Sequence, residues 1–217
     1  MQIDDMDFSL ALKLYTAEQV KSGEVEAARL AGISMYSLMQ RAGMAVYERF
    51  QTLYPRAKKV VVLCGKGNNG GDGYVFATLA QQAQLDVSVF QAGKEEALKG
   101  DAKLAFQEWA LNDGRHSDWN YWEEALFEAD VIIDALLGTG LSGDVKTPLS
   151  EYIDQINRIR CPVISIDIPS GLCANTGNVL GHAVKADHTV TFIGVKQGLC
   201  TGQARSNVGE LHFAGLG

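Results

Sequence analysis

The sequence predicts an α/β protein with a three-layer α/β/α sandwich and a mostly parallel sheet. Short apolar segments rich in β-branched residues, such as Lys59–Cys64, are typical of strands covered on both faces. Segments with helical spacing alternate with these strands along the chain. The first strand, helix and strand together span roughly 30 residues, which is the size of a βαβ unit. This alternation favours helices on both faces of a parallel sheet.

The N-terminal part of the chain predicts two helices before the first strand. Residues 1–15 show no clear periodicity and are expected to form a loose arm. Thr16 and Gln19 have capping-box spacing, which predicts a helix that reaches about Ala31. Ser34 then begins a second helix with apolar residues at helical spacing. We expect both helices to pack outside the sandwich.

The rest of the chain follows the alternating pattern in order. Strands are expected at 59–64, 85–90, 130–135, 162–167, 189–193 and 210–213, the last at an edge of the sheet. Helices are expected at 74–80, within 95–112, at 120–128 and at 148–159. No linker or repeat interrupts the series, so we expect one domain over 1–217. The chain stops at Gly217 directly after a strand, which is either a natural end or the cut edge of a longer protein.

Composition excludes several classes of protein. The chain has 217 residues and a formal net charge of −7, which argues against a nucleic-acid binder. No apolar run approaches the ~18 residues that span a bilayer, and the acidic N-terminus does not resemble a signal peptide. The cysteines form no Cys-x-x-Cys pair, and no histidine is spaced to complete a zinc site with them. We therefore expect free thiols in a reducing cytoplasm, with Cys64 and Cys161 in the core.

A glycine-rich loop, Gly65–Gly73, follows the first strand and predicts a nucleotide-type ligand site. No Gly-Lys-Ser or Gly-Lys-Thr follows its glycines, so it is not a Walker loop. It also departs from the dinucleotide fingerprint, because no acidic residue ends the next strand. Five glycines with Asn68, Asn69 and Asp72 still exceed what a tight strand-to-helix turn requires. Glycines give a phosphate access to backbone N–H groups at a helix N-terminus.

Two more strands end on carboxylates. Asp134 precedes a second glycine loop, and Asp167 precedes Ser170. The carboxyl ends of parallel strands meet at one edge of a sheet, so these groups are expected to share a cleft with the first loop. Each aspartate is alternatively a helix cap or a loop anchor. Oxygens from Asn69, Asp134 and Ser170 suit a hard cation, and with one formal charge an alkali ion is as reasonable as magnesium.

Three further polar residues carry weaker signals. Lys196 follows another strand end, where it either faces a phosphate or is a solvated loop lysine. His182 and His188 have no partner visible in the sequence and are interpreted as structural.

Three segments together resemble one known family. Gly67–Gly73, Asp134–Gly140 and Asp167–Gly171 are similar to the signature segments of the YjeF N-terminal domain family, whose members are NAD(P)H-hydrate epimerases. The resemblance extends from Thr16 to Phe213. It implies a Rossmann-like fold and a substrate that is hydrated NADH or NADPH (NADHX or NADPHX). The implied reaction interconverts the two epimers of this damaged cofactor so that a dehydratase can repair it.

The same resemblance implies the site residues. Its potassium-ligand positions fall on Asn69, Asp134 and Ser170, with one K⁺ per subunit. Its substrate-binding positions fall on Asn68, Asn69, Gly70, Gly71, Asp72, Gly138, Thr139, Gly140, Leu141, Ser142, Gly143, Asp144 and Asp167. It also implies a homodimer, and a fused or separate ADP- or ATP-dependent dehydratase as a partner.

The chemistry is a hypothesis at this stage. Epimerisation requires the carbon–oxygen bond at the hydrated carbon to break and re-form on the other face, and Asp167 is the expected acid and base. The alternative is a catalytically idle nucleotide-binding or protein-interaction module on the same fold. A flavodoxin-like carrier is disfavoured because the strand-end loops lack an aromatic pair to sandwich a flavin.

Overall fold

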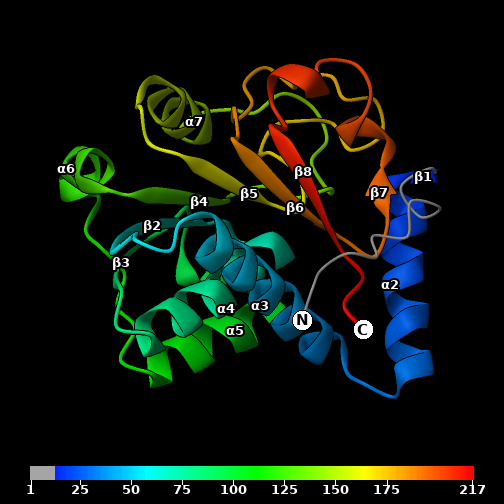
Figure 1. Ribbon diagram of the computed structural model, residues 1–217, viewed down its shortest axis with the longest axis horizontal. Helices are drawn as coiled ribbons and strands as arrows, with labels where there is room; N and C mark the ends of the chain where they lie inside the picture. Colours follow the sequence, from blue (N-terminus) through cyan, green and yellow to red (C-terminus); the bar gives the residue numbers. More distant parts are fainter. Residues whose placement is uncertain (1–12) are drawn as a thin grey trace.

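The computed structural model describes residues 13–217 (Figure 1). The predicted loose arm, 1–15, falls mainly on residues outside this range. Its last two residues form a short strand, β1 (Leu14–Tyr15), which pairs in parallel with β7 (Val195–Lys196). The sequence did not predict this two-stranded sheet, because neither strand is long enough to show a period.

The main sheet has six strands in the order β3-β2-β4-β5-β6-β8, and every neighbouring pair is parallel. The mostly parallel sheet predicted from the sequence is confirmed, and so is the last strand as an edge strand. The strands are β2 (Lys59–Cys64), β3 (Asp86–Gln91), β4 (Val131–Ala135), β5 (Val163–Ile166), β6 (His188–Phe192) and β8 (Glu210–Ala214).

Helices cover both faces of the sheet (Figure 1). One face carries α3 (Met35–Leu53), α4 (Asn68–Gln82) and α5 (Gly100–Leu111), and the other carries α6 (Trp122–Glu128) and α7 (Leu149–Arg158). Each face has its own apolar core, one centred on residues such as Phe50 and Phe76 and the other on residues such as Ile132 and Ile153. The short 3-10 helices are η1 (Glu95–Ala97), η2 (Trp119–Tyr121), η3 (Gln197–Leu199) and η4 (Ala204–Ser206).

The two N-terminal helices begin where their caps predict. Thr16 caps α2 (Ala17–Ala31): its side chain accepts from the Gln19 backbone N–H, and the Gln19 side chain accepts from the Thr16 N–H. The side chain of Ser34 caps α3 by accepting from the backbone N–H of Ser37, without a reciprocal bond. α2 stands beside the main sheet, near β1 and β7, as expected for a helix outside the sandwich (Figure 1). The second N-terminal helix, α3, was also expected outside, but it forms part of the layer on one face of the sheet, where its apolar residues join the core.

Helix α4 begins at Asn68, six residues before the start predicted at Tyr74. The prediction treated the glycines as a loop because glycine is a poor helix former. Tertiary packing explains them instead. A Cβ atom at Gly70 would lie 2.0 Å from the carbonyl oxygen of Gly65, and one at Gly73 would lie 2.7 Å from the Cβ atom of Ala135. The glycines therefore let the first turns of α4 approach the ends of β2 and β4.

The strand order places a topological switch between β2 and β4. From β2 the chain crosses to β3 on one side, and it then returns to β4 on the other side. In open α/β sheets the ligand site lies beyond the carboxyl ends of the strands at such a point. No helix in the described part of the chain is long and apolar enough to cross a membrane.

Candidate active site

A cavity of about 640 Å³ opens at this switch point. Its volume lies within the usual range for small-molecule sites, about 300–1,000 Å³. Its walls are the start of α4, the loop after β4, the carboxyl ends of β5 and β6, and side chains from α2 and α3. The predicted substrate-binding residues among its lining are Asn68, Asn69, Asp72, Gly138, Thr139, Gly140, Leu141, Ser142 and Asp167.

Four of the predicted substrate-binding residues do not line this cavity. Gly70 and Gly71 lie on the buried side of α4, where they allow close packing: a Cβ atom at Gly71 would lie 2.6 Å from the sulfur of Met39. Gly143 and Asp144 are exposed, further along the loop that follows β4. The structure therefore separates the predicted residues into those that face the cavity and those that shape its walls or continue beyond it.

The N-terminus of α4 lies at this cavity, where Gly67, Asn68 and Asn69 line the wall. Gly67 is the N-cap residue and has no side chain to occupy the backbone N–H groups, and no side-chain cap forms. The first N–H groups of a helix have no partner within the helix, and they favour an anion. Lys21 and Lys66, two exposed lysines at the cavity, add positive charge nearby. This wall is suited to a phosphate group.

Asp134 lies below the cavity in a dense hydrogen-bond network. Its side chain is fully buried, and it accepts from the Ser165 hydroxyl at 2.8 Å, from the Ser170 hydroxyl at 2.5 Å and from the Ser170 N–H at 2.9 Å. Burial raises the pKa of the Asp134 carboxyl, while the hydrogen bonds from Ser170 and Ser165 oppose this. Asp134 is not among the residues that line the cavity.

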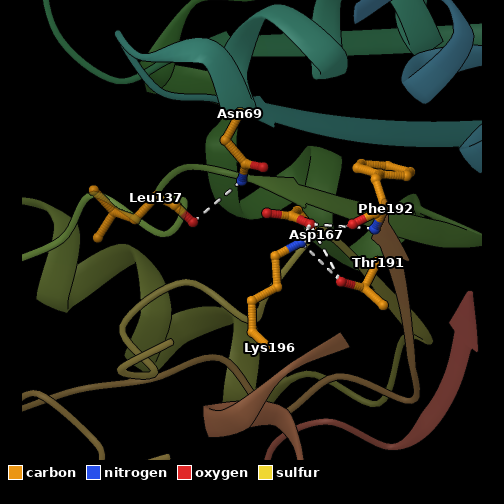
Figure 2. A network of polar contacts seen from close by, with 6 residues as sticks. All are labelled: Asn69, Leu137, Asp167, Thr191, Phe192 and Lys196. Carbon is orange, nitrogen blue, oxygen red and sulfur yellow. Dashed lines mark hydrogen bonds and ion pairs between the residues drawn. The ribbon is translucent and has the colours of Figure 1, made fainter. Parts of the chain in front are cut away.

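Asn69 connects this network to the start of α4. Its side-chain amide donates to the carbonyl oxygen of Leu137 at 3.1 Å (Figure 2). The hydroxyl of Ser170 donates to the same oxygen at 3.2 Å. Gly138 leaves room for this arrangement, since a Cβ atom there would lie 3.2 Å from the Cβ of Asn69. The structure thus links the three predicted metal ligands: Asn69 and Ser170 share the carbonyl oxygen of Leu137, and Ser170 also donates to Asp134.

Asp167 presents its carboxylate to the cavity directly. Its backbone has a φ of 67°, in the left-handed region that non-glycine residues rarely adopt. The backbone N–H of Asp167 donates to Val190 at 2.7 Å, which holds this conformation against β6. The side chain is 14% exposed, so it combines access to the cavity with fixed surroundings.

Lys196 is the partner of Asp167 (Figure 2). Its ammonium group contacts the Asp167 carboxylate, and it also donates to the Thr191 hydroxyl at 3.0 Å and to the Phe192 carbonyl oxygen at 3.3 Å. The lysine is fully buried. The two roles considered for Lys196 from the sequence, a phosphate contact or a solvated loop lysine, are therefore both wrong, because β7 carries its side chain inward to an aspartate.

Among the other carboxyl groups that line the cavity, Asp72 and Glu24 interact electrostatically with Asp167 and Lys196. Asp72 of α4 is half-buried, and Glu24 reaches the cavity from α2. Burial raises the pKa of Asp72 well above its usual range, and the negative charge of Asp167 adds to the effect. Burial and Asp167 also raise the pKa of Glu24, which the positive charge of Lys196 opposes. The buried ammonium group of Lys196 thus contacts one carboxylate, Asp167, and its charge also acts on Asp72 and Glu24.

Sequence reasoning missed Glu24 and Lys196 as parts of the site. Glu24 lies in the middle of an amphipathic helix expected outside the sandwich, and only the tertiary placement of α2 brings it to the cavity. Apolar residues of α3, including Met35 and Met39, also line the cavity. A methionine at helical spacing carries no signal that separates a core position from a cavity wall.

The family model described as YjeF-related protein N-terminus matches residues 35–198, which is most of the chain. The chain belongs to the YjeF N-terminal family. The matched region includes all three signature segments. It also includes the predicted metal ligands Asn69, Asp134 and Ser170, and the pair of Asp167 and Lys196.

The relatives of this YjeF N-terminal domain differ in length. The chain is 42% identical over 210 residues to the bifunctional NAD(P)H-hydrate repair enzyme Nnr of Escherichia coli, where it covers 96% of the chain but 40% of the relative. It is 36% identical over 199 residues to the NAD(P)H-hydrate epimerase of Limosilactobacillus fermentum, and here it covers 92% of the chain and 94% of the relative. The chain thus spans about two-fifths of the bifunctional enzyme and nearly all of the epimerase.

A solved structure supports the fold of the YjeF N-terminal domain independently. The crystal structure of the yeast protein YNL200c superposes with a TM-score of 0.77 over 87% of this chain and 84% of the yeast chain. At 22% identity, this likeness bears on the fold alone.

Proposed function

We propose that this YjeF N-terminal domain is an NAD(P)H-hydrate epimerase, which interconverts the two epimers of NADHX and NADPHX. The observation that carries the proposal is the position of Asp167: a constrained carboxylate that faces a ligand-sized cavity and is paired with a buried lysine. The relative from Limosilactobacillus fermentum, which the chain covers over 94% of that relative's length, is named an NAD(P)H-hydrate epimerase. The family membership and the cavity chemistry thus point to the same activity.

The substrate's pyrophosphate is proposed to bind at the N-terminus of α4. The uncapped N–H groups after Gly67 supply hydrogen-bond donors, and Lys21 and Lys66 supply charge. The loop from Gly138 to Ser142 forms the facing wall. This orientation leaves the nicotinamide end of the substrate toward Asp167 and Asp72.

A potassium ion is proposed at the cluster of Asn69, Asp134 and Ser170. Side-chain oxygens of these residues and the carbonyl of Leu137 form an oxygen-only set with one negative charge, which suits a hard monovalent cation. The buried Asp134, whose pKa is raised by its burial, would be held as a carboxylate by a cation. When bound, the ion supplies positive charge that orders the loop after β4 beside the substrate.

Asp167 is proposed as the acid and base. A proton held on the Asp167–Lys196 pair passes to the hydroxyl group at the hydrated carbon, and the carbon–oxygen bond breaks to release water. The ring nitrogen's electron pair stabilises the resulting cation. Water then adds to the opposite face, and Asp167 takes up the proton that this water loses. The proton count is therefore restored at the end of each turnover.

The proposal is tested with one purified epimer of hydrated NADH. Mixing it with the protein and following the other epimer by chromatography should give interconversion well above the spontaneous rate. A rate equal to the spontaneous one would instead favour the catalytically idle module. Asp72 and Asp167 argue against that module, since a mere binder of an anionic ligand gains nothing from carboxyl groups in its site.

Partners and assembly are also proposals. The bifunctional relatives are more than twice as long as the matched region, which supports a dehydratase that works with this domain, either fused to it or separate. The homodimer and the cytoplasmic location expected from the sequence stay predictions.

A further inference from the structure

Three side chains of types that bind metal ions lie together at the amino ends of two strands, away from the cavity at the carboxyl ends. β6 begins at His188 and β8 begins at Glu210, and the two parallel strands lie side by side (Figure 1). The register pairs His188 with Glu210 and Val190 with His212. Because side chains alternate between faces, His188, Glu210 and His212 all project from the same face. The ring of Tyr54, at the end of α3, packs 5.8 Å from the ring of His188 on that face.

The ligand atoms of these three residues are spaced as they would be around one ion. Nδ1 of His188 lies 3.1 Å from Nε2 of His212 and 3.6 Å from Oε2 of Glu210. One ligand atom from each residue can be chosen so that all lie within 4.8 Å of one another. Two nitrogens bound to zinc at about 2.0–2.1 Å in a tetrahedral site lie roughly 3.3 Å apart. The histidine pair therefore has a separation close to that of two ligands of one metal.

The surroundings of His212 favour the neutral imidazole, which is the form that binds a metal. His212 is 7% exposed, and burial, with the nearby charge of Arg49, lowers its pKa to about 4. Its imidazole is therefore neutral at neutral pH, as a metal ligand must be. Arg49 is an unfavourable charge nearby, and the carboxylate of Glu210, which lies close to both rings, opposes it. Glu210 is exposed, so water has access to the remaining coordination positions.

We propose that His188, Glu210 and His212 form a binding site for a divalent transition-metal ion of the zinc class, completed by water. Two imidazole nitrogens and one carboxylate oxygen are a common ligand set for such ions. The bound ion ties the edge strand β8 to β6. This site is independent of the proposed epimerase activity, because it lies at the amino ends of strands whose carboxyl ends face the cavity. The alternative is a neutral hydrogen bond between the two imidazoles with no ion.

Calorimetric titration of the untagged, chelator-treated protein with zinc chloride tests the proposal. The wild-type protein should saturate at one equivalent. Glu210→Gln and His188→Gln should each weaken zinc binding by about tenfold or more, since even the loss of an outer-shell partner costs 10–100-fold. His182→Gln is the matched control, because His182 pairs with Asp154 outside the cluster and should bind zinc as the wild type does. Glu210 is on the surface, so its variant should fold.

Cobalt provides a second readout. Wild-type protein with one equivalent of Co²⁺ should show visible absorption bands that disappear in His188→Gln, and zinc should raise the thermal midpoint of the wild type but not of Glu210→Gln. The proposal is overturned if the wild type shows no saturable zinc binding. It is equally overturned if Glu210→Gln and His188→Gln bind zinc as tightly as the wild type, or if His182→Gln alone abolishes binding.

Discussion

The ammonium group of Lys196 contacts the carboxylate of Asp167 from a position that is itself closed to solvent, while the aspartate faces the cavity. Further hydrogen bonds to the Thr191 hydroxyl and the Phe192 carbonyl fix the lysine. The carboxylate is therefore oriented by a group that is not among the residues lining the cavity. This arrangement keeps the proposed acid–base group in one geometry.

Replacing each of the two aspartates, Asp167 and Asp134, in turn tests which of them is the acid–base group. Asp167→Asn should lower the rate of epimerisation by about 100-fold or more, because a positioned acid–base group contributes about 10²–10⁴. Substrate binding should change little, since the amide keeps the shape of the side chain. Asp134→Asn is the matched variant in the buried network. Normal epimerisation in Asp167→Asn, together with its loss in Asp134→Asn, would reverse the assignment.

Potassium dependence should separate Asp134 from Asp167 in a different way. Potassium chloride should raise the thermal midpoint of the wild-type protein above that in choline chloride of equal ionic strength, because an ion that binds only the folded state stabilises it. Asp134→Asn removes the single negative charge of the cluster and should abolish the difference. Asp167→Asn should retain it. Equal midpoints of the wild-type protein in the two salts would argue against the ion.

Removing the buried lysine should destabilise the domain through the aspartate it leaves behind. Lys196→Met should lower the free energy of unfolding by about 3–5 kcal/mol, the usual cost of breaking a buried pair. The double variant Lys196→Met/Asp167→Asn should recover part of this loss, because it no longer leaves a charge unpaired. Urea unfolding of the four proteins measures the coupling. Strictly additive effects of the two changes would show that the pair carries no coupling energy.

The glycine loop offers a matched pair of substitutions. A Cβ atom at Gly65 would lie 1.8 Å from the carbonyl oxygen of Leu136, whereas one at Gly67 would meet nothing within 4 Å. Gly65→Ala should therefore lower the free energy of unfolding by about 1–3 kcal/mol or more, as overpacking does. Gly67→Ala should change it by less than about 1 kcal/mol. Similar losses in both variants would mean that the loop has room to move.

The stability of the domain should fall in acid partly because of His212. Burial and the charge of Arg49 lower the folded-state pKa of His212 from 6.5 to about 4. As pH falls, His212 is therefore protonated in the unfolded chain at a higher pH than in the folded protein. The contribution of neutral His212 to the free energy of unfolding is thus fully present above pH 6.5 and is lost as pH falls toward 4. His212→Gln should remove up to about 3 kcal/mol of this pH dependence. Unfolding by urea at several pH values, with chelator present, measures the difference between the two proteins. The same slope in both would contradict the lowered pKa.

The sequence predicted the order and type of the main elements well, because each buried strand is a continuous apolar run that needs no tertiary information. It also placed Asp134 and Asp167 at neighbouring strand ends, and this is confirmed: Asp134 is the second-last residue of β4, and Asp167 directly follows β5. The start of α4 was wrong because helix propensity is local. The glycines of α4 allow close contacts with the ends of β2 and β4, and the sequence of the helix alone does not reveal these contacts.

The sequence did not predict several polar contacts, because they too depend on tertiary structure. Lys196 occupies a glycine-flanked segment that reads as a loop, and only its pairing with β1 and the turn at Asp167 bury it. Glu24 belongs to a helix whose placement beside the cavity depends on the whole fold. His188 and His212 are 24 residues apart and meet only through the register of β6 and β8.

The most direct test of the central claim is the reaction of one purified NADHX epimer in water enriched in ¹⁸O. If Asp167 promotes cleavage and re-formation of the carbon–oxygen bond, the wild-type protein should convert the epimer well above the spontaneous rate. The hydroxyl group of the product should then carry ¹⁸O. Asp167→Asn should show neither effect beyond the spontaneous reaction. Conversion by the wild-type protein without ¹⁸O in the product, or no conversion above the spontaneous rate, would contradict the account.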